Sequence, residues 1–164
     1  MKEDAEISII KNIQALPGKY KSIITKIMRL FSAPFHCKLY IVIILVLFYF
    51  KKISTSQAFI LCTSQFIIVT IKYIVKRKRP FEVNKDIKLL ENMDYDPYSF
   101  PSGHTLNVFL LSVILKKNMN INMNIIPYLV GISRVYLGVH YPSDILGGII
   151  LTKIILHFYE FDAK

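Results

Sequence analysis

Apolar and polar residues form long alternating blocks along this chain. Five apolar segments, at about residues 36–50, 57–75, 104–115, 125–139 and 145–161, are separated by charged or turn-forming residues. None of them shows the period-two alternation of a half-buried strand, and no internal repeat is present. The pattern predicts an all-α protein with one helix in each apolar segment.

The apolar segments are short for a membrane protein, because a helix that crosses the hydrocarbon core needs roughly 20 mostly apolar residues. Short apolar segments can still span a membrane if the polar ends of their helices reach the interface or line a protected cavity. Composition also favours a membrane: 53% of the 164 residues are hydrophobic and the net charge is +10, which soluble domains rarely combine. We therefore predict a polytopic membrane bundle of about five transmembrane helices, with a soluble helical bundle as the alternative.

Residues 1–35 differ from the rest because basic side chains are spread among isoleucines and leucines. This arrangement is typical of a broken amphipathic helix that lies at the membrane interface. The predicted organisation is therefore an interfacial segment at 1–35 and a membrane-embedded domain at 36–164. The N-terminus lacks the order of a signal peptide, and Cys37 and Cys62 lack the spacing of a metal site or a redox motif.

One long polar connection, residues 81–103, interrupts the apolar pattern. Connections of this length inside a compact domain are often functional. Two crossings separate the N-terminus from residue 76, and two more separate residue 104 from residue 140. The polar clusters at 72–80, 101–104 and 133–144 are therefore predicted on one face of the membrane.

The first cluster, KYIVKRKRP, places Lys72 and Arg79 seven residues apart, on one face of a helix and about 10 Å apart. Pro80 ends that helix. Two cations on one face suit a doubly charged phosphate, with Arg79 as a planar fork and Lys72 as a point charge. The alternatives are a juxtamembrane positive anchor and a nucleic-acid site, which the adjoining hydrophobic span disfavours.

The second cluster, Pro101-Ser102-Gly103-His104, precedes an apolar helix. Pro and Ser favour a helix start, where free backbone amides attract anions. Gly103 lets a phosphate oxygen approach its N–H, Ser102 offers a hydroxyl, and His104 follows in the first turn. The pattern indicates an anion cradle with a proton donor, and a plain helix cap is the alternative.

The third cluster, SRVYLGVHYPSD, contains Arg134, His140 and Asp144. Arg134 and His140 share a site only if the chain bends, and Gly138 and the Tyr141-Pro142 step favour such a bend. Asp144 is placed to accept a hydrogen bond from one nitrogen of His140 and so fix its tautomer. A structural His–Asp pair is the alternative.

In these motifs the chain resembles the type-2 phosphatidic acid phosphatase superfamily, also called lipid phosphate phosphatases. The family signatures K-x6-RP, PSGH and SR-x5-H-x3-D stand at Lys72 to Pro80, Pro101 to His104 and Ser133 to Asp144, in order and without a mismatch. The resemblance covers about residues 56 to 161. It differs at the amino terminus, where many family members have a sixth span and residues 1–35 are too charged for one.

The resemblance implies a role for each motif residue. His140 would attack phosphorus and become a phosphohistidine, Asp144 would orient it, and His104 would protonate the leaving oxygen. The phosphoryl oxygens would be held by Lys72, Arg79, Ser102, Gly103 and Arg134. No carboxylate cluster suited to a metal accompanies the motifs, and the family implies no metal and no other cofactor.

The expected function is hydrolysis of a phosphomonoester or diphosphate on a lipid, namely isoprenoid diphosphate, phosphatidate or phosphatidylglycerophosphate. The expected partners are this lipid and the bilayer, without nucleic acid, and no pattern specifies an oligomeric state. A lipid phosphotransferase and a non-catalytic protein that binds anionic lipid remain alternatives. A soluble haloperoxidase with the same signatures is disfavoured by the five apolar runs. His36, His157 and Lys153 receive no role, and Asn107, one turn after His104, is a candidate to face the site.

Charge predicts the orientation of a multi-pass protein, which in a bacterium lies in the plasma membrane. A five-span topology places 15 of the 21 Lys and Arg residues on the side of the site. The positive-inside rule then favours a cytoplasmic site, although many bacterial relatives face outward.

Overall fold

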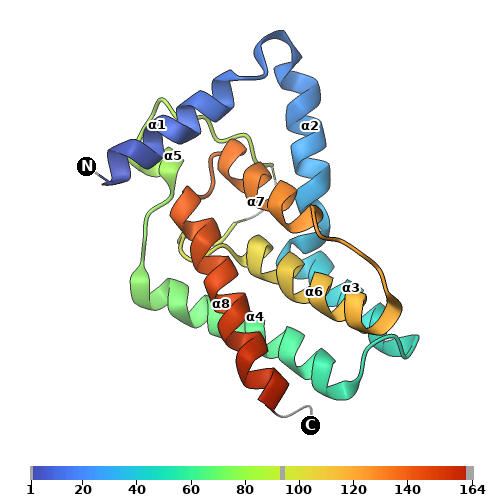
Figure 1. The fold of residues 1–164 in the computed structure, drawn as a ribbon. Helices are drawn as coiled ribbons and strands as arrows, with labels where there is room; N and C mark the ends of the chain where they lie inside the picture. The colour runs from blue at the N-terminus through green and yellow to red at the C-terminus, as the bar shows by residue number, and fades with distance from the viewer. Residues whose placement is uncertain (1, 93–94, 162–164) are drawn as a thin grey trace.

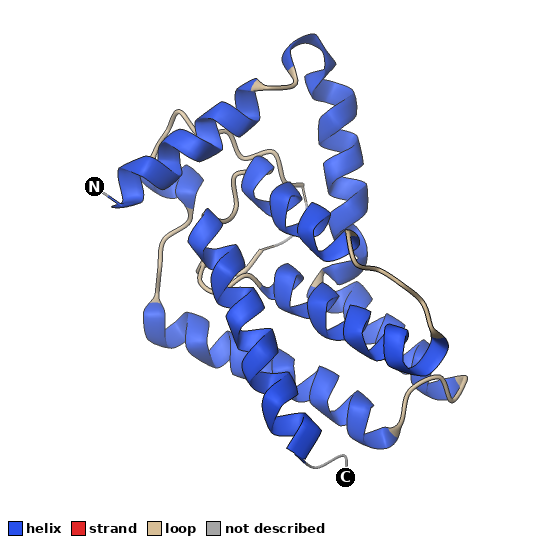
Figure 2. Ribbon diagram, viewed as in Figure 1, coloured by secondary structure: helices blue, strands red, loops and turns tan. Residues whose placement is uncertain are grey.

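The computed structural model describes residues 2–92 and 95–161, and within these ranges every regular element is a helix (Figure 2). This confirms the predicted all-α class. In chain order the elements are α1 (Lys2–Ala15), η1 (Gly18–Tyr20), α2 (Lys21–Ser32), η2 (Ala33–Phe35), α3 (Cys37–Tyr49), α4 (Thr55–Val75), α5 (Pro80–Val83), α6 (Gly103–Met119), α7 (Ile126–Tyr136) and α8 (Pro142–Phe161). Helices α3, α4, α6, α7 and α8 coincide with the five apolar segments.

Local sequence signals set the ends of the helices next to the polar loops. A capping box between Ser54 and Gln57 opens α4, and Lys76 closes it in the left-handed conformation with φ 52°. Ser102 caps α6 through its side chain. Gly138, with φ +80°, turns the chain between α7 and α8, and a Cβ there would lie 2.5 Å from the Lys88 carbonyl oxygen. The predicted bend before His140 is therefore present and needs glycine.

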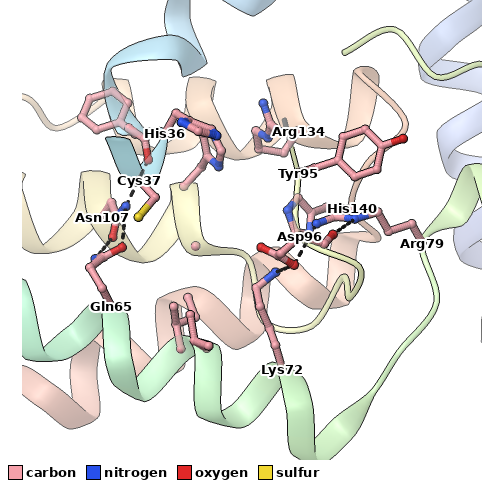
Figure 3. Close-up of a pocket in the computed structure, with 15 residues that line it drawn as sticks. His36, Cys37, Gln65, Lys72, Arg79, Tyr95, Asp96, Asn107, Arg134 and His140 are labelled. Carbon is pink, nitrogen blue, oxygen red and sulfur yellow. Dashed lines mark hydrogen bonds and ion pairs between the residues drawn. The ribbon is translucent and has the colours of Figure 1, made fainter. Parts of the chain in front are cut away.

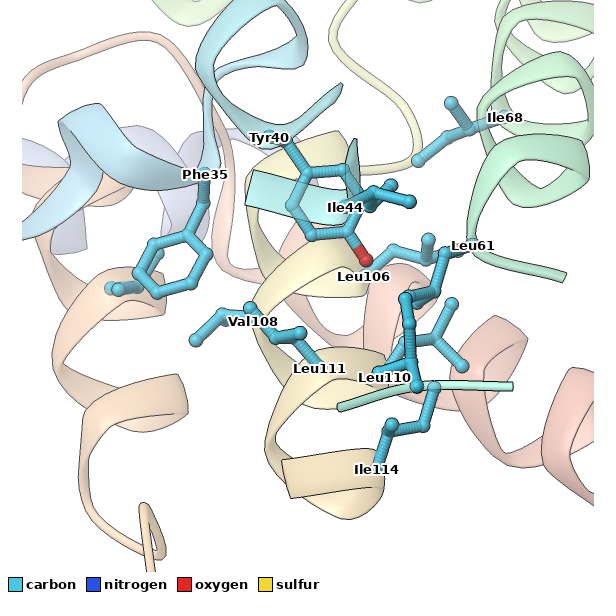
Figure 4. Close-up of a cluster of buried hydrophobic side chains, with 12 residues drawn as sticks. Phe35, Tyr40, Ile44, Leu61, Ile68, Leu106, Val108, Leu110, Leu111 and Ile114 are labelled. Carbon is cyan, nitrogen blue, oxygen red and sulfur yellow. The ribbon is translucent and has the colours of Figure 1, made fainter. Parts of the chain in front are cut away.

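Helix α6 lies at the centre of the bundle and contacts α3, α4, α7 and α8 (Figure 1). Figure 4 shows its apolar side chains meeting Tyr40 and Ile44 of α3 and Leu61 of α4. The N-terminal end of α6 is therefore held on several sides, which fixes the position of the residues that begin it.

Many large apolar side chains remain exposed on the outer faces of α3, α4 and α8. Phe59 and Phe66 on α4 are 68% and 76% exposed, and Phe158 on α8 is 69% exposed. Exposed apolar surface of this extent is typical of contact with a membrane or a partner. By length and composition, one described helical stretch, Thr55–Val83, suffices to cross a membrane, or two if Gly18–Phe35 and Cys37–Tyr49, bent by 52°, form one span.

The N-terminal segment is a broken helix, and it packs on α7 and on the polar connection (Figure 1). Gln14 donates hydrogen bonds to the carbonyls of Lys88 and Tyr136, at 2.7 and 2.9 Å. Arg29 donates to the carbonyl of Leu90 at 2.7 Å. Residues 2–35 therefore brace the connection that leads to the site, in addition to any contact that they make with a membrane.

Candidate active site

The three motif clusters meet at one cavity of about 250 Å³ near the N-terminal end of α6 (Figure 3). Its wall combines basic and imidazole side chains from every cluster. They are Lys72, Arg79, His104, Arg134 and His140, and Gly103 also lines the cavity. Residues that are up to 68 positions apart in the sequence thus share one site.

Lys72 and Arg79 converge on one carboxylate, that of Asp96 (Figure 3). Lys72 Nζ lies 2.9 Å and Arg79 Nη2 lies 3.1 Å from the same Asp96 oxygen, Oδ1. Both basic side chains are buried, whereas the Asp96 side chain is 46% exposed. Burial opposes ionisation of Asp96, but the two cations outweigh it and hold the pKa of this carboxyl below its usual value. An anion therefore already lies between the two cations predicted to hold phosphate.

Backbone carbonyls complete the coordination of these two cations. Lys72 Nζ donates to the Tyr98 carbonyl at 2.7 Å, and Arg79 donates to the carbonyls of Asp96 and Val139 at 2.9 and 2.7 Å. Arg79 therefore ties the polar connection to the segment that carries His140. Such bonds orient a guanidinium before any ligand arrives.

Only part of the second motif, which begins α6, lines the cavity. Gly103 and His104 line it, whereas Ser102 is fully buried and does not. The Ser102 hydroxyl oxygen accepts from Thr105 Oγ1 at 2.9 Å and from Thr105 N at 3.4 Å. The contacts of Ser102 are therefore those of a helix cap, which is the alternative interpretation of this motif. Nε2 of His104 is buried and has no hydrogen-bond partner within residues 2–92 and 95–161.

His140 and Asp144 form the pair that their spacing predicts. His140 Nδ1 lies 3.3 Å from Asp144 Oδ2, which also accepts from the Tyr141 backbone N–H at 2.9 Å. An ionised carboxylate can only accept, so this contact favours the tautomer protonated on Nδ1 and leaves Nε2 with a lone pair. Burial, followed by the nearby Arg79 and Lys72, lowers the pKa of His140 well below its usual value, so its ring is neutral at pH 7.

Arg134 reaches the cavity from α7 and is held from behind. Its Nη1 forms an ion pair with Glu91 and donates to Ser32 Oγ at 3.1 Å, while its buried Nε has no hydrogen-bond partner in the described part of the chain. Glu91 belongs to the polar connection and Ser32 to α2. The connection and the N-terminal segment thus both fix this guanidinium.

Sequence reasoning missed the acidic partners of the site. The length of the polar connection predicts a function for it, yet nothing in its spacing distinguishes Asp96 and Glu91 from its other carboxylates. Asp94, in the same connection, lies outside the described residues. His36, assigned no role, lines the cavity with its ring centroid 5.8 Å from that of His104. Asn107 also lines it, bonded to Gln65 and to the Phe35 carbonyl.

A helical bundle with exposed apolar faces is the architecture of an α-helical membrane protein, and its internal cavity is lined by basic side chains. The chain belongs to the PAP2 superfamily, whose family model matches residues 54–160. This confirms the resemblance drawn from the three motifs. The match also spans all five helices from α4 to α8.

Named relatives agree with this membership. Phosphatidylglycerophosphatase B of Bacillus subtilis is 30% identical over 159 residues, which cover 87% of this chain and 75% of that protein. An undecaprenyl-diphosphatase of Sulfolobus acidocaldarius is 43% identical over 84 residues, which cover 49% of this chain and 40% of that protein.

Two crystal structures share the fold. A transmembrane PAP2-type phosphatidylglycerolphosphate phosphatase from Bacillus subtilis is 28% identical with a TM-score of 0.68, and the match covers 96% of this chain and 85% of that chain. Aquifex aeolicus LpxE is 22% identical with a TM-score of 0.69, over 92% of this chain and 93% of that chain. At that identity the second likeness concerns the fold alone.

Proposed function

We propose that this chain is an integral membrane enzyme that hydrolyses a phosphomonoester or diphosphate on a lipid. The observation that carries the proposal is the cavity itself: His104 and His140, the second of them paired with a buried carboxylate, face the same space as Lys72, Arg79 and Arg134. Phosphoryl transfer depends mainly on positioning and on stabilising charge at the equatorial oxygens. The family membership and the names of the relatives support the same chemistry.

The proposed reaction has two steps. His140 Nε2 forms a bond to phosphorus while the bond from phosphorus to the leaving oxygen breaks, and His104 gives that oxygen a proton. The leaving group is the lipid alcohol of a phosphomonoester or the lipid monophosphate of a diphosphate. Water then attacks phosphorus, the bond from phosphorus to Nε2 breaks, His104 takes a proton from the water, and inorganic phosphate leaves. Asp144 keeps Nδ1–H of His140 oriented and stabilises the positive ring during attack.

The phosphoryl oxygens are assigned to the side chains of Lys72, Arg79 and Arg134 and to the Gly103 amide. Ser102 is assigned an indirect role, because its hydroxyl is bonded to Thr105 and its cap orients the first amides of α6. Charge stabilisation is assigned to these groups rather than to a metal. Among the described residues no three His, Cys, Asp or Glu side chains have metal-binding geometry.

We assign five crossings to α3, α4, α6, α7 and α8, with residues 1–35 at the interface on the side of the site. The embedded domain is residues 36–164, of which 93–94 and 162–164 lie outside the described residues. Helix α7 has only 11 residues, so its crossing depends on the loops around it and on burial against α6. The site then lies at one membrane face, where a head group enters and the lipid tail stays in the bilayer.

The substrate is proposed as a lipid phosphate of the kinds that the relatives' names contain, phosphatidylglycerophosphate or undecaprenyl diphosphate, with phosphatidate as a third candidate. A turnover screen of the detergent-purified protein across these lipids measures the preference. Adding an alcohol acceptor and analysing the products separates hydrolysis from phosphotransfer.

The decisive experiment measures phosphate release by the purified protein. We expect turnover that persists in EDTA, is inhibited by vanadate, and falls by about 10³-fold or more in His140→Ala. His157→Ala is the matched control, because His157 is exposed, outside the motifs and beside Phe158. Undiminished turnover in His140→Ala would overturn the assignment of the nucleophile.

A further inference from the structure

Arg77 lies inside the first motif but makes none of the contacts expected of a phosphate-binding cation. Its Nη1 lies 2.7 Å from Asp144 Oδ1 and 2.6 Å from Ser143 Oγ. The guanidinium carbon also lies 3.7 Å from the centroid of the Tyr141 ring. Arg77 does not line the cavity. It therefore lies behind the His140–Asp144 pair, on the side away from the substrate.

The two oxygens of Asp144 have different partners. Oδ2 accepts from His140 Nδ1 and from the Tyr141 amide, while Oδ1 faces Arg77. The Asp144 side chain is fully buried. An isolated buried carboxylate is costly, and Arg77 is the cation that compensates it among the described ion pairs. A carboxylate fixed at both oxygens cannot rotate away from the imidazole.

The N-terminal helix holds Arg77 from its other side. Arg77 Nη2 lies 2.8 Å from Glu6 Oε2, and the second oxygen of Glu6 accepts from the Ser143 backbone N–H at 2.7 Å. Glu6 thus bridges the guanidinium and the first turn of α8, which carries Asp144. A continuous chain of contacts runs from Glu6 of α1 through Arg77 and Asp144 to His140.

We propose that Arg77 is a positioning residue for the nucleophile, and that Glu6 of α1 anchors it, so that the N-terminal segment is part of the catalytic unit. This inference rests on the proposed function. Arg77 sets the orientation and ionisation of Asp144, and through it the tautomer and aim of His140. Phosphate binding is assigned to Lys72, Arg79 and Arg134. Loss of the Arg77 side chain should therefore lower kcat and leave KM nearly unchanged.

The test compares Arg77→Ala and Arg77→Lys with Lys78→Ala, a control that removes an exposed cation one residue away. We expect kcat to fall by about 10²-fold in Arg77→Ala, since small misplacement of a reacting group has effects of that size. KM and vanadate inhibition should stay close to those of the unchanged protein. Arg77→Lys should recover part of kcat, because a lysine keeps the charge but not the fork, and Lys78→Ala should be neutral.

Glu6→Gln provides a second route if Arg77→Ala fails to fold. This substitution keeps the side-chain shape and removes the charge next to Arg77. As a single variant it should have a kcat several-fold lower than that of the unchanged protein. In a double variant with Arg77→Lys the two losses should be less than multiplicative, because both act through one contact chain.

The outcomes separate this inference from the proposed function. Undiminished kcat in Arg77→Ala, or a fall in vanadate affinity parallel to the fall in kcat/KM, overturns the positioning role while turnover that depends on His140 still supports the enzyme. Absence of turnover in the unchanged protein overturns the proposed function itself. Multiplicative losses of Glu6→Gln and Arg77→Lys overturn the anchoring role of α1.

Discussion

His140, the proposed nucleophile, occupies a buried position among cations, and this environment determines the pH at which its ring is protonated. Burial and the charges of Arg79 and Lys72 lower its pKa below the usual 6.5 of a histidine. The protonated form therefore appears only at pH values well under 6.5. The same shift makes the unfolded chain bind a proton that the folded chain does not, so stability falls as pH drops below about 6.5.

This pKa shift predicts the pH dependence of the reaction. The acid limb of kcat/KM in the free enzyme should lie below pH 6.5. Replacing Lys72 by Met removes one of the cations that lower the pKa, so the acid limb of the residual activity should move to higher pH. A pH series of initial rates with both proteins measures this, and an unmoved limb in Lys72→Met would contradict the electrostatic account.

Asp96 is the residue whose replacement should strengthen anion binding. Its carboxylate lies between Lys72 and Arg79, the two cations proposed to hold the phosphate of the substrate. Asp96→Asn keeps the shape and removes the competing charge, so we expect vanadate to inhibit at concentrations about tenfold lower, the equivalent of about 1.4 kcal/mol. Asp86→Asn is the control, since Asp86 pairs with Lys11 at the surface. Weaker vanadate binding in Asp96→Asn would show that Asp96 orders the cations instead.

At the scale of elements, close packing between α6 and α8 fixes the start of α6. A Cβ at Gly148 would lie 2.8 Å from the Ser102 carbonyl oxygen, a backbone atom that cannot move aside cheaply. The Asp144 carbonyl oxygen accepts from the Ser102 amide at 3.0 Å. The first turns of the two helices are therefore one packed unit, and this unit brings the second and third motifs together.

This packing predicts opposite outcomes for two glycines. Gly148→Ala should lower the free energy of unfolding by about 1–3 kcal/mol, the usual effect of overpacking. Gly103→Ala should leave it nearly unchanged, because its Cβ would meet only Ile68 Cδ1 at 3.6 Å. The methyl group would instead crowd the amide proposed to bind phosphate and raise KM. Thermal unfolding and steady-state kinetics of both variants measure these two effects. A Gly148→Ala variant as stable as the unchanged protein would contradict the packing argument.

At the scale of the whole molecule, the residues that begin α6 and line the cavity lie at one end of this helix. The α6–α7 loop lies at its other end (Figure 1). With five crossings, the charge distribution predicts that the site end faces the cytoplasm. Residues 120–125, which join α6 to α7, then face outward. Both ends carry exposed positions that accept a reporter, namely Asn122 in the loop and Lys85 in the polar connection.

Cysteine labelling tests this orientation in a chain whose Cys37 and Cys62 are replaced by Ser. Asn122→Cys should react with an impermeant maleimide added to intact cells, and Lys85→Cys should react only after the membrane is opened. The reverse pattern would place the site on the outer face. Labelling of both positions in intact cells would contradict the five-span topology.

Local patterns in the sequence determined the helical elements and the motif residues. Hydrophobic runs located α3, α4, α6, α7 and α8 within a few residues, because burial periodicity and capping act over neighbouring positions. The three motifs identified the lining cations and two of the lining histidines, His104 and His140, but not His36. They did so because phosphate chemistry restricts which side chains can serve it. Family membership followed from the same residues.

Tertiary structure alone decided the partners of those residues. Asp96 with Lys72, Glu91 with Arg134, and Glu6 with Arg77 are pairs separated by 24 to 71 positions, and no local pattern relates their members. The position of α1 behind the His140–Asp144 pair could not be predicted from the sequence either. An amphipathic face fits a lipid surface or a neighbouring helix equally well. The sequence specifies which residues each segment must bury. Which charged side chains pair with one another is decided by how the segments pack in three dimensions.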